Sequence, residues 1–267
     1  FPVSDIVITK TVHTDAVDDQ AVAVEYGPFP VTVTCELASR AVYAAGYDAE
    51  TPMATDLVDG EPFTLEALPV GAACVITETD AKDAVATSIT TVNEAATLTT
   101  EATTAEFALD ESDTAISVDN SYDVGSVTLS KRVWGDGAEA WGTAAFTVTL
   151  ECTLTDASGT RTVYTASHDF RQGDEPVTYS NIAAGATCVV TETSTGSATA
   201  TTITVADGEP TEGTSAEFGI DGEVAVEVAN RFDTTSIAVD KVREGAGAEL
   251  WGAGPFEVTL TCSFDGE

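Results

Sequence analysis

The sequence predicts an all-β protein made of two-sheet β-sandwich modules arranged end to end. Apolar residues alternate with polar ones in short segments that Gly, Pro and Asp interrupt, which is the pattern of half-buried strands. Thr and Ala are abundant and there is only one Met, as in many surface proteins rich in strands. Long segments also recur at a nearly constant spacing, which is typical of tandem modules. We therefore expect almost no helix.

Composition excludes several classes of partner. The 10 Lys and Arg residues against 45 Asp and Glu residues leave a net charge of −35 at pH 7. Such a chain does not bind nucleic acid as its main role, and an anionic membrane surface repels it. Hydrophobic residues make up 43% of the sequence, which is enough to bury cores, so we expect a folded chain. No apolar run approaches the ~20 residues of a membrane span.

Two segments recur along the chain. Residues 71–79 (GAACVITET) return as 185–193 (GATCVVTET), and residues 141–152 (WGTAAFTVTLEC) return as 251–262 (WGAGPFEVTLTC). A degenerate copy of the second segment occupies residues 26–35. The repeats divide the chain into two complete modules and the start of a third, at residues 1–124, 125–233 and 234–267. The linkers are very short, so we expect the modules to stack as a rod.

The first strand of each module holds one of only four lysines in the sequence. Side chains alternate between the two faces of a strand, so residues of equal parity point the same way. Each of these lysines shares a face with apolar residues: Lys10 with Ile6 and Ile8, Lys131 with Val127 and Leu129, and Lys241 with Ile237 and Val239. We therefore expect all three lysines to face the core.

Two further polar residues point inwards in each complete module. On the middle strand, Glu78 shares a face with Cys74 and Ile76, and Glu192 shares one with Cys188 and Val190. On the last strand, Asn120 shares a face with Val118, and Asn230 with Val228. Each complete module thus has one inward Lys, one inward Glu and one inward Asn.

A buried Lys or Glu is unfavourable unless it is paired or used chemically. Burial favours the uncharged amine and the uncharged carboxyl, so the amine can attack an Asn carboxamide while the carboxyl transfers protons. Ammonia leaves, and an isopeptide bond joins the first strand to the last. Two other interpretations stay open: a hydrogen-bonded cluster that never reacts, and an error in strand parity caused by a bulge.

The residues that carry a family resemblance lie around the Glu strand. Residues 63–71 (FTLEALPVG), followed by 75–79 (VITET), resemble the signature of the Cna protein B-type (SpaA-like) domains of Gram-positive pilins and adhesins. The opening residues 127–131 and the closing residues 226–230 are similar to that family's first and last strands. The cysteine pattern is closer still to repeat domains of uncharacterised function on actinobacterial cell-wall-anchored proteins.

This resemblance implies immunoglobulin-like sandwiches with internal isopeptide bonds. It pairs Lys10 with Asn120, and Lys131 with Asn230, with Glu78 and Glu192 as the respective proton shuttles. Lys241 has no partner within the sequence. The resemblance implies no cofactor.

The implied role is structural: a stalk or fibre segment outside a Gram-positive, actinobacterial-like cell, anchored to the wall or part of a fibre. We interpret the chain as a piece of a longer exported protein whose partners are neighbouring modules. It is not an enzyme beyond forming its own bonds, because a hydrolase would need a carboxylate pair or triad in one pocket. The alternative is an adhesin module that binds a host protein or a glycan through variable loops.

Five cysteines in an exported chain suggest two disulfides and one unpaired thiol. Parity places four of them on the core side, and we expect Cys35 to pair with Cys74 and Cys152 with Cys188. Cys262 is the counterpart of Cys152 in the third module. No Cys-x-x-Cys motif or Cys/His cluster is present, so we expect no metal site. The acidic runs are interpreted as a solvated surface.

Overall fold

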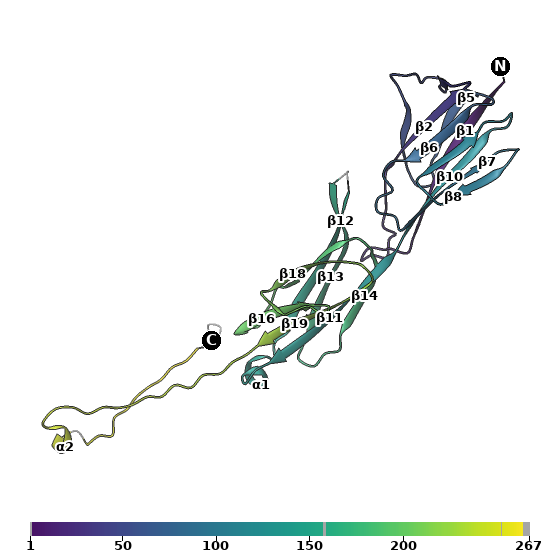
Figure 1. Ribbon diagram of the computed structural model, residues 1–267. Coiled ribbons are helices and arrows are strands. Elements are labelled where there is room, and N and C mark those ends of the chain that lie inside the picture. Colours follow the sequence, from purple (N-terminus) through teal and green to yellow (C-terminus); the bar gives the residue numbers. More distant parts are fainter. Residues whose placement is uncertain (1, 157–158, 252, 264–267) are drawn as a thin grey trace.

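The computed structural model describes residues 2–156, 159–251 and 253–263. Two β-sandwiches lie end to end along one long axis, and residues 234–251 and 253–263 extend beyond the second sandwich (Figure 1). Within these described ranges, the helices are two single turns, α1 (Ala138–Trp141) and α2 (Ala248–Trp251). The predicted all-β fold of tandem sandwiches is confirmed.

The first sandwich consists of two facing sheets. Its strands are β1 (Val3–Thr14), β2 (Phe29–Leu37), β3 (Arg40–Val42), β4 (Met53–Leu57), β5 (Pro62–Pro69), β6 (Ala73–Glu78), β7 (Ala86–Val92), β8 (Thr97–Thr100), β9 (Thr104–Ala108) and β10 (Thr114–Tyr122). One sheet has the order β5-β1-β10-β7-β8. The other has the order β3-β2-β6-β9, with β4 also paired to β2.

The second sandwich repeats this plan with fewer strands. Its strands are β11 (Val124–Trp134), β12 (Phe146–Asp156), β13 (Gly159–Phe170), β14 (Val177–Ala183), β15 (Thr187–Glu192), β16 (Ala200–Val205), β17 (Thr211–Glu212), β18 (Ser215–Gly219) and β19 (Glu223–Arg231). The two sheets have the orders β14-β11-β19-β16-β17 and β13-β12-β15-β18. The sequence repeat therefore corresponds to a repeat of topology.

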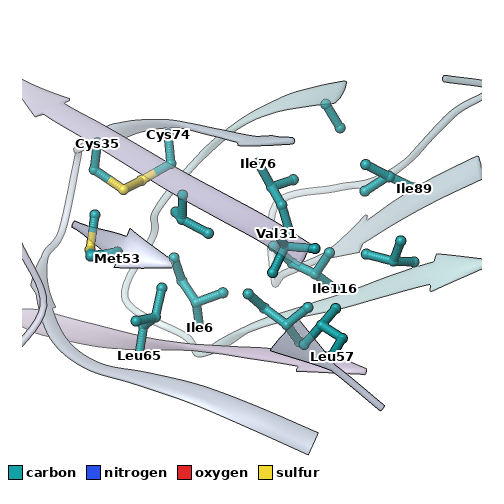
Figure 2. Packing of buried hydrophobic residues seen from close by; sticks show 14 of the residues in the cluster. Ile6, Val31, Cys35, Met53, Leu57, Leu65, Cys74, Ile76, Ile89 and Ile116 are labelled. Atoms are coloured by element: carbon teal, nitrogen blue, oxygen red, sulfur yellow. A yellow bond between two sulfur atoms is a disulfide. The ribbon is translucent and has the colours of Figure 1, made fainter. Parts of the chain in front are cut away.

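The core of the first sandwich lies between its two sheets. Ile6 of β1 and Ile116 of β10 point from one sheet towards Val31 of β2 and Ile76 of β6 on the other (Figure 2). Alternation of buried and less buried positions along β1 as far as Lys10, and along the whole of β6, places these side chains inside. Each apolar side chain buried in this way contributes about 1.5–3 kcal/mol.

The first and last strands of each sandwich are direct neighbours. β1 pairs with β10 in parallel, and β11 pairs with β19 in parallel. A single residue, Asp123, separates β10 from β11, so the last strand of one sandwich runs almost directly into the first strand of the next (Figure 1).

A loop of the first sandwich crosses to the second. This loop, residues 15–28, connects β1 to β2, and we call it the strap. Its Ala16 and Val24 are buried among core residues of the second sandwich. The Val17 backbone N–H donates a hydrogen bond to the Asn181 carbonyl at 3.0 Å. These contacts make the junction a packed interface, which restricts the angle between the sandwiches.

Residues 234–251 and 253–263 form no strand pairs. They run out from the second sandwich to α2 and back (Figure 1). Their apolar side chains, such as Ile237 and Leu260, are exposed. Of the segment 234–267 that the sequence assigns to a third module, residues 252 and 264–267 lie outside the described residues.

Candidate functional site

In the first sandwich, three polar side chains meet inside the core. Lys10 comes from β1, Glu78 ends β6 in the facing sheet, and Asn120 lies near the end of β10. The Lys10 Nζ donates to Glu78 Oε1 at 2.8 Å, and the Asn120 Nδ2 donates to the same oxygen at 3.1 Å. Exposed fractions of 0–2% show that all three residues are shielded from solvent.

Strand register brings the lysine and the asparagine together. In the parallel pair of β1 and β10, Lys10 lies opposite Val118, and Val12 lies opposite Asn120. Lys10 and Asn120 therefore differ by two positions along the ladder and share its inner face. β6 lies in the opposite sheet, and its alternation of buried residues directs Glu78 towards them.

The second sandwich contains the same constellation. Lys131 comes from β11, Glu192 ends β15, and Asn230 lies on β19. The Lys131 Nζ lies 2.7 Å from Glu192 Oε1, and the Asn230 Nδ2 donates to that oxygen at 3.0 Å. Both repeats thus place an amine and a carboxamide nitrogen on one carboxylate oxygen.

Burial controls the electrostatics of both lysines. Desolvation is the largest influence and lowers the pKa of Lys10 and of Lys131 below the usual 10.5, although the neighbouring glutamates oppose it. An aromatic ring covers each amine: Lys10 Nζ lies 4.3 Å from the centre of the Phe29 ring, and Lys131 Nζ lies 4.5 Å from that of Phe146. Both rings are fully buried and exclude water from the amine.

Several polar atoms of these clusters have no hydrogen-bond partner. They are the second carboxylate oxygen of Glu78 and of Glu192 and the Asn120 Oδ1. A buried polar atom without a partner is destabilising by about 1–3 kcal/mol. If the two clusters served only to pack the cores, their unpaired polar atoms would therefore lower the stability of both sandwiches.

The sequence matches one family model twice, over residues 6–123 and over residues 127–233. The family is described as a domain of unknown function, DUF5979. The chain belongs to this family. Each match spans one sandwich from its first strand to its last, so each polar cluster lies within one DUF5979 domain. Comparison with curated proteins gave no significant match.

Solved structures similar to the pair of DUF5979 domains include pilins and an adhesin. The major pilin of Streptococcus pyogenes is 14% identical, with a TM-score of 0.45, and the match covers 87% of this chain and 99% of the pilin. The T-13 major pilin of that species is 12% identical, with a TM-score of 0.47, over 87% and 98%. A Mobiluncus mulieris adhesin containing disulfide, isopeptide and ester cross-links is 16% identical, with a TM-score of 0.34, over 78% and 86%.

Each DUF5979 domain also carries one disulfide. Cys35 is bonded to Cys74 and Cys152 to Cys188, the pairs expected from the sequence, with separations of 39 and 36 residues. Both disulfides join adjacent strands of the sheet that supplies the glutamate. Cys262 is an exposed free thiol.

Lys241 departs from expectation, because it is exposed rather than directed into a core. No second sheet covers residues 234–251 and 253–263, so the inner face predicted from parity has nothing to pack against. The Lys241 Nζ donates to the Val242 carbonyl at 3.2 Å and lies 4.8 Å from the Phe256 ring centre. This lysine and aromatic ring repeat the contact seen in both DUF5979 domains.

Sequence reasoning missed several residues of the clusters. Phe29 and Phe146 were identifiable, because each begins the second strand of its repeat, shortly after a position of the repeat that holds Gly27 or Gly142. The hydroxyls of Tyr122 and Thr201 were not, because the hydrogen bond of Tyr122 to the Ala81 carbonyl and the pairing of Thr201 with Asn230 depend on the tertiary structure. Among the described residues, no group of His, Cys, Asp and Glu is arranged to hold a metal ion, and no helix could cross a membrane.

Proposed function

We propose that this chain is a load-bearing segment of a stalk or fibre on a bacterial surface. Each of its domains is closed by an isopeptide bond, between Lys10 and Asn120 and between Lys131 and Asn230. The observation that carries the proposal is the buried Lys, Glu and Asn cluster, which occurs twice and in each case links the first strand to the last.

The reaction needs only the residues of the cluster. A proton passes from the Lys10 Nζ to Glu78, which leaves a neutral amine in a site where burial already disfavours the ammonium. The amine attacks the Asn120 Cγ and a new C–N bond forms. Glu78 then protonates Nδ2, the old C–N bond breaks and ammonia leaves, and the Glu78 carboxylate takes the second proton from the new amide nitrogen. Lys131, Glu192 and Asn230 act in the same way.

These bonds would carry tension through the rod. Force that enters along β1 would cross from Lys10 to Asn120, continue through Asp123 into β11, and cross again from Lys131 to Asn230. The residues between each bonded pair would bear little of the load. A stalk needs such resistance to extension, and the strap supports it by packing the two sandwiches together.

The remaining assignments follow from this role. The domain boundaries proposed are 1–124 and 125–233, with a third module starting at residue 234. The partners of the chain are neighbouring modules of the same fibre, and the chain lies outside a Gram-positive cell. Glu78 and Glu192 act once per molecule, so the protein turns over no external substrate.

Intact mass tests the proposal directly. Under reducing conditions, the chain should weigh two ammonia molecules less than its sequence predicts. Under non-reducing conditions, each of the two disulfides should remove a further two hydrogens. Branched peptides that join residues 10 to 120 and 131 to 230 should appear after digestion. A mass that matches the sequence, apart from cysteine oxidation, would refute the isopeptide bonds.

An adhesin is the second candidate, and a difference between the domains favours it. Between β2 and β5, the first domain has two short strands, β3 and β4, whereas the second domain has the long hairpin of β12 and β13. Such differences at corresponding edges are expected if the loops bind ligands. A screen of the chain against glycans and matrix proteins separates the two roles, because a pure stalk binds neither.

A further inference from the structure

The two polar clusters differ in how they hold the asparagine. In the second sandwich, the Thr201 hydroxyl donates a hydrogen bond to Asn230 Oδ1 at 3.1 Å. Thr201 lies on β16, directly opposite Asn230 in the antiparallel pair with β19. In the first sandwich, Thr87 of β7 lies opposite Asn120, yet the Asn120 Oδ1 has no hydrogen-bond partner.

The amide nitrogen is held differently as well. Asn230 Nδ2 donates to Glu192 and also to the Thr195 carbonyl, at 3.1 Å. The equivalent carbonyl in the first sandwich, that of Ala81, accepts a short hydrogen bond of 2.7 Å from the Tyr122 hydroxyl. Asn120 Nδ2 therefore lies at 3.5 Å from it.

The residue two positions after the asparagine accounts for that difference. Tyr122 follows Asn120, whereas Phe232, which has no hydroxyl, follows Asn230. The Thr195 carbonyl is thus left for the amide. Asn230 is oriented by Glu192, Thr195 and Thr201 together, and Asn120 chiefly by Glu78.

We infer that Thr201 is a further catalytic residue of the second sandwich, which activates the Asn230 carbonyl for attack by Lys131. This inference rests on the proposed isopeptide bonds. When the Lys131 Nζ bonds to Asn230 Cγ, the carbonyl electrons move to Oδ1, and the Thr201 hydroxyl stabilises the resulting negative charge. The carbonyl forms again as the Cγ–Nδ2 bond breaks, and ammonia leaves with the proton that Glu192 took from the lysine. The Glu192 carboxylate then takes the second proton from the new amide nitrogen.

The consequence is a difference in rate within one chain. Removing one hydrogen-bond donor from an oxyanion site slows acyl transfer by about 10²–10³-fold. The second sandwich has this donor and the first lacks it, so the bond between Lys131 and Asn230 should form before that between Lys10 and Asn120.

A quenched time course of cell-free synthesis tests the inference. The full chain is made under oxidising conditions, portions are denatured at intervals, and the branched peptide of each sandwich is measured by mass spectrometry. Thr201→Val removes the hydroxyl at nearly constant volume and should slow bond formation in the second sandwich by about 10²-fold. Thr201→Ser keeps a hydroxyl and should restore the rate, which a purely structural role would not require.

Thr87→Val is the matched control, and it should leave the rate of the first sandwich unchanged because Thr87 donates no hydrogen bond to Asn120 Oδ1. An unchanged rate in the Thr201→Val chain would overturn the role of Thr201 and leave the isopeptide proposal standing. Isopeptide formation that is as fast in the first sandwich as in the second would also count against the role of Thr201. If neither branched peptide ever forms in the unaltered chain, the proposed function itself fails.

Discussion

The Lys10 Nζ lies 2.8 Å from Glu78 Oε1, and both side chains are completely buried. The two residues come from opposite sheets of the sandwich, so the contact closes across the core. A buried ion pair is weak support for stability, because removing two charges from water offsets most of their attraction. Its repetition as Lys131 and Glu192 is better explained by chemistry than by stability.

Glu78→Gln should stop bond formation in the first sandwich only. The change keeps the size of the side chain but removes the group that accepts the lysine proton. The chain should then lose one ammonia, from the second sandwich, and the first sandwich should be destabilised by at least about 3–5 kcal/mol, because Lys10 is left buried without a counter-charge. Peptide mass mapping and denaturant titration measure the two effects. Glu192→Gln should have the corresponding effects on the second sandwich and leave the bond of the first sandwich intact. Loss of both ammonia molecules from either variant would contradict the assigned roles.

The lowered pKa of Lys10 predicts a pH effect that the bond abolishes. In an Asn120→Ala chain, Lys10 remains an amine, with a pKa below 10.5 when folded and near 10.5 when unfolded. Between these values the unfolded state binds more protons, so the free energy of unfolding should rise with pH. In the unaltered chain the nitrogen is an amide and does not titrate. Denaturant titrations from about pH 7 to about pH 10 should show the stability advantage of the unaltered chain over the variant narrowing as the pH rises, and a constant difference would contradict the prediction.

The strap predicts that a substitution in the first sandwich destabilises the second. Val24 is 8% exposed among core residues of the second sandwich, so Val24→Asp buries a charge there and should destabilise it by about 2–3 kcal/mol. Hydrogen exchange should accelerate in residues 177–186, near the contact with Asn181. Val22→Asp is the control, because Val22 lies in the same strap but is 59% exposed. Equal effects of the two substitutions would show that the strap does not couple the sandwiches.

The two cross-links of each sandwich should respond differently to force. Cys35 and Cys74 both lie between Lys10 and Asn120 in the chain, inside the loop that the isopeptide bond would close. Replacing both by Ala should lower the free energy of unfolding by about 3–4 kcal/mol but add no extension in single-molecule pulling. Lys10→Ala should allow the first sandwich to unfold and extend. Extension of the disulfide-free chain in the presence of Lys10 would place the disulfide on the load path instead.

The sequence alone was sufficient for the fold class and for most members of the clusters. Alternation along a strand is a local property, so parity placed Lys10, Glu78 and Asn120 inside before any strand pairing was known. The second module shows the same pattern again in Lys131, Glu192 and Asn230. The exposed Lys241 shows the limit of parity, since a strand has an inner face only when a second sheet covers it.

Only the tertiary structure decided which residues surround these clusters. The hydrogen bond of Thr201 to Asn230, and the burial of Val24 in a neighbouring sandwich, join residues that lie far apart in the chain. Strand neighbours and domain contacts are set by the packing of the whole chain, and periodicity carries no information about them. The sequence by itself thus determined that the Lys, Glu and Asn of each complete module are buried, and the fold determined which atoms they meet.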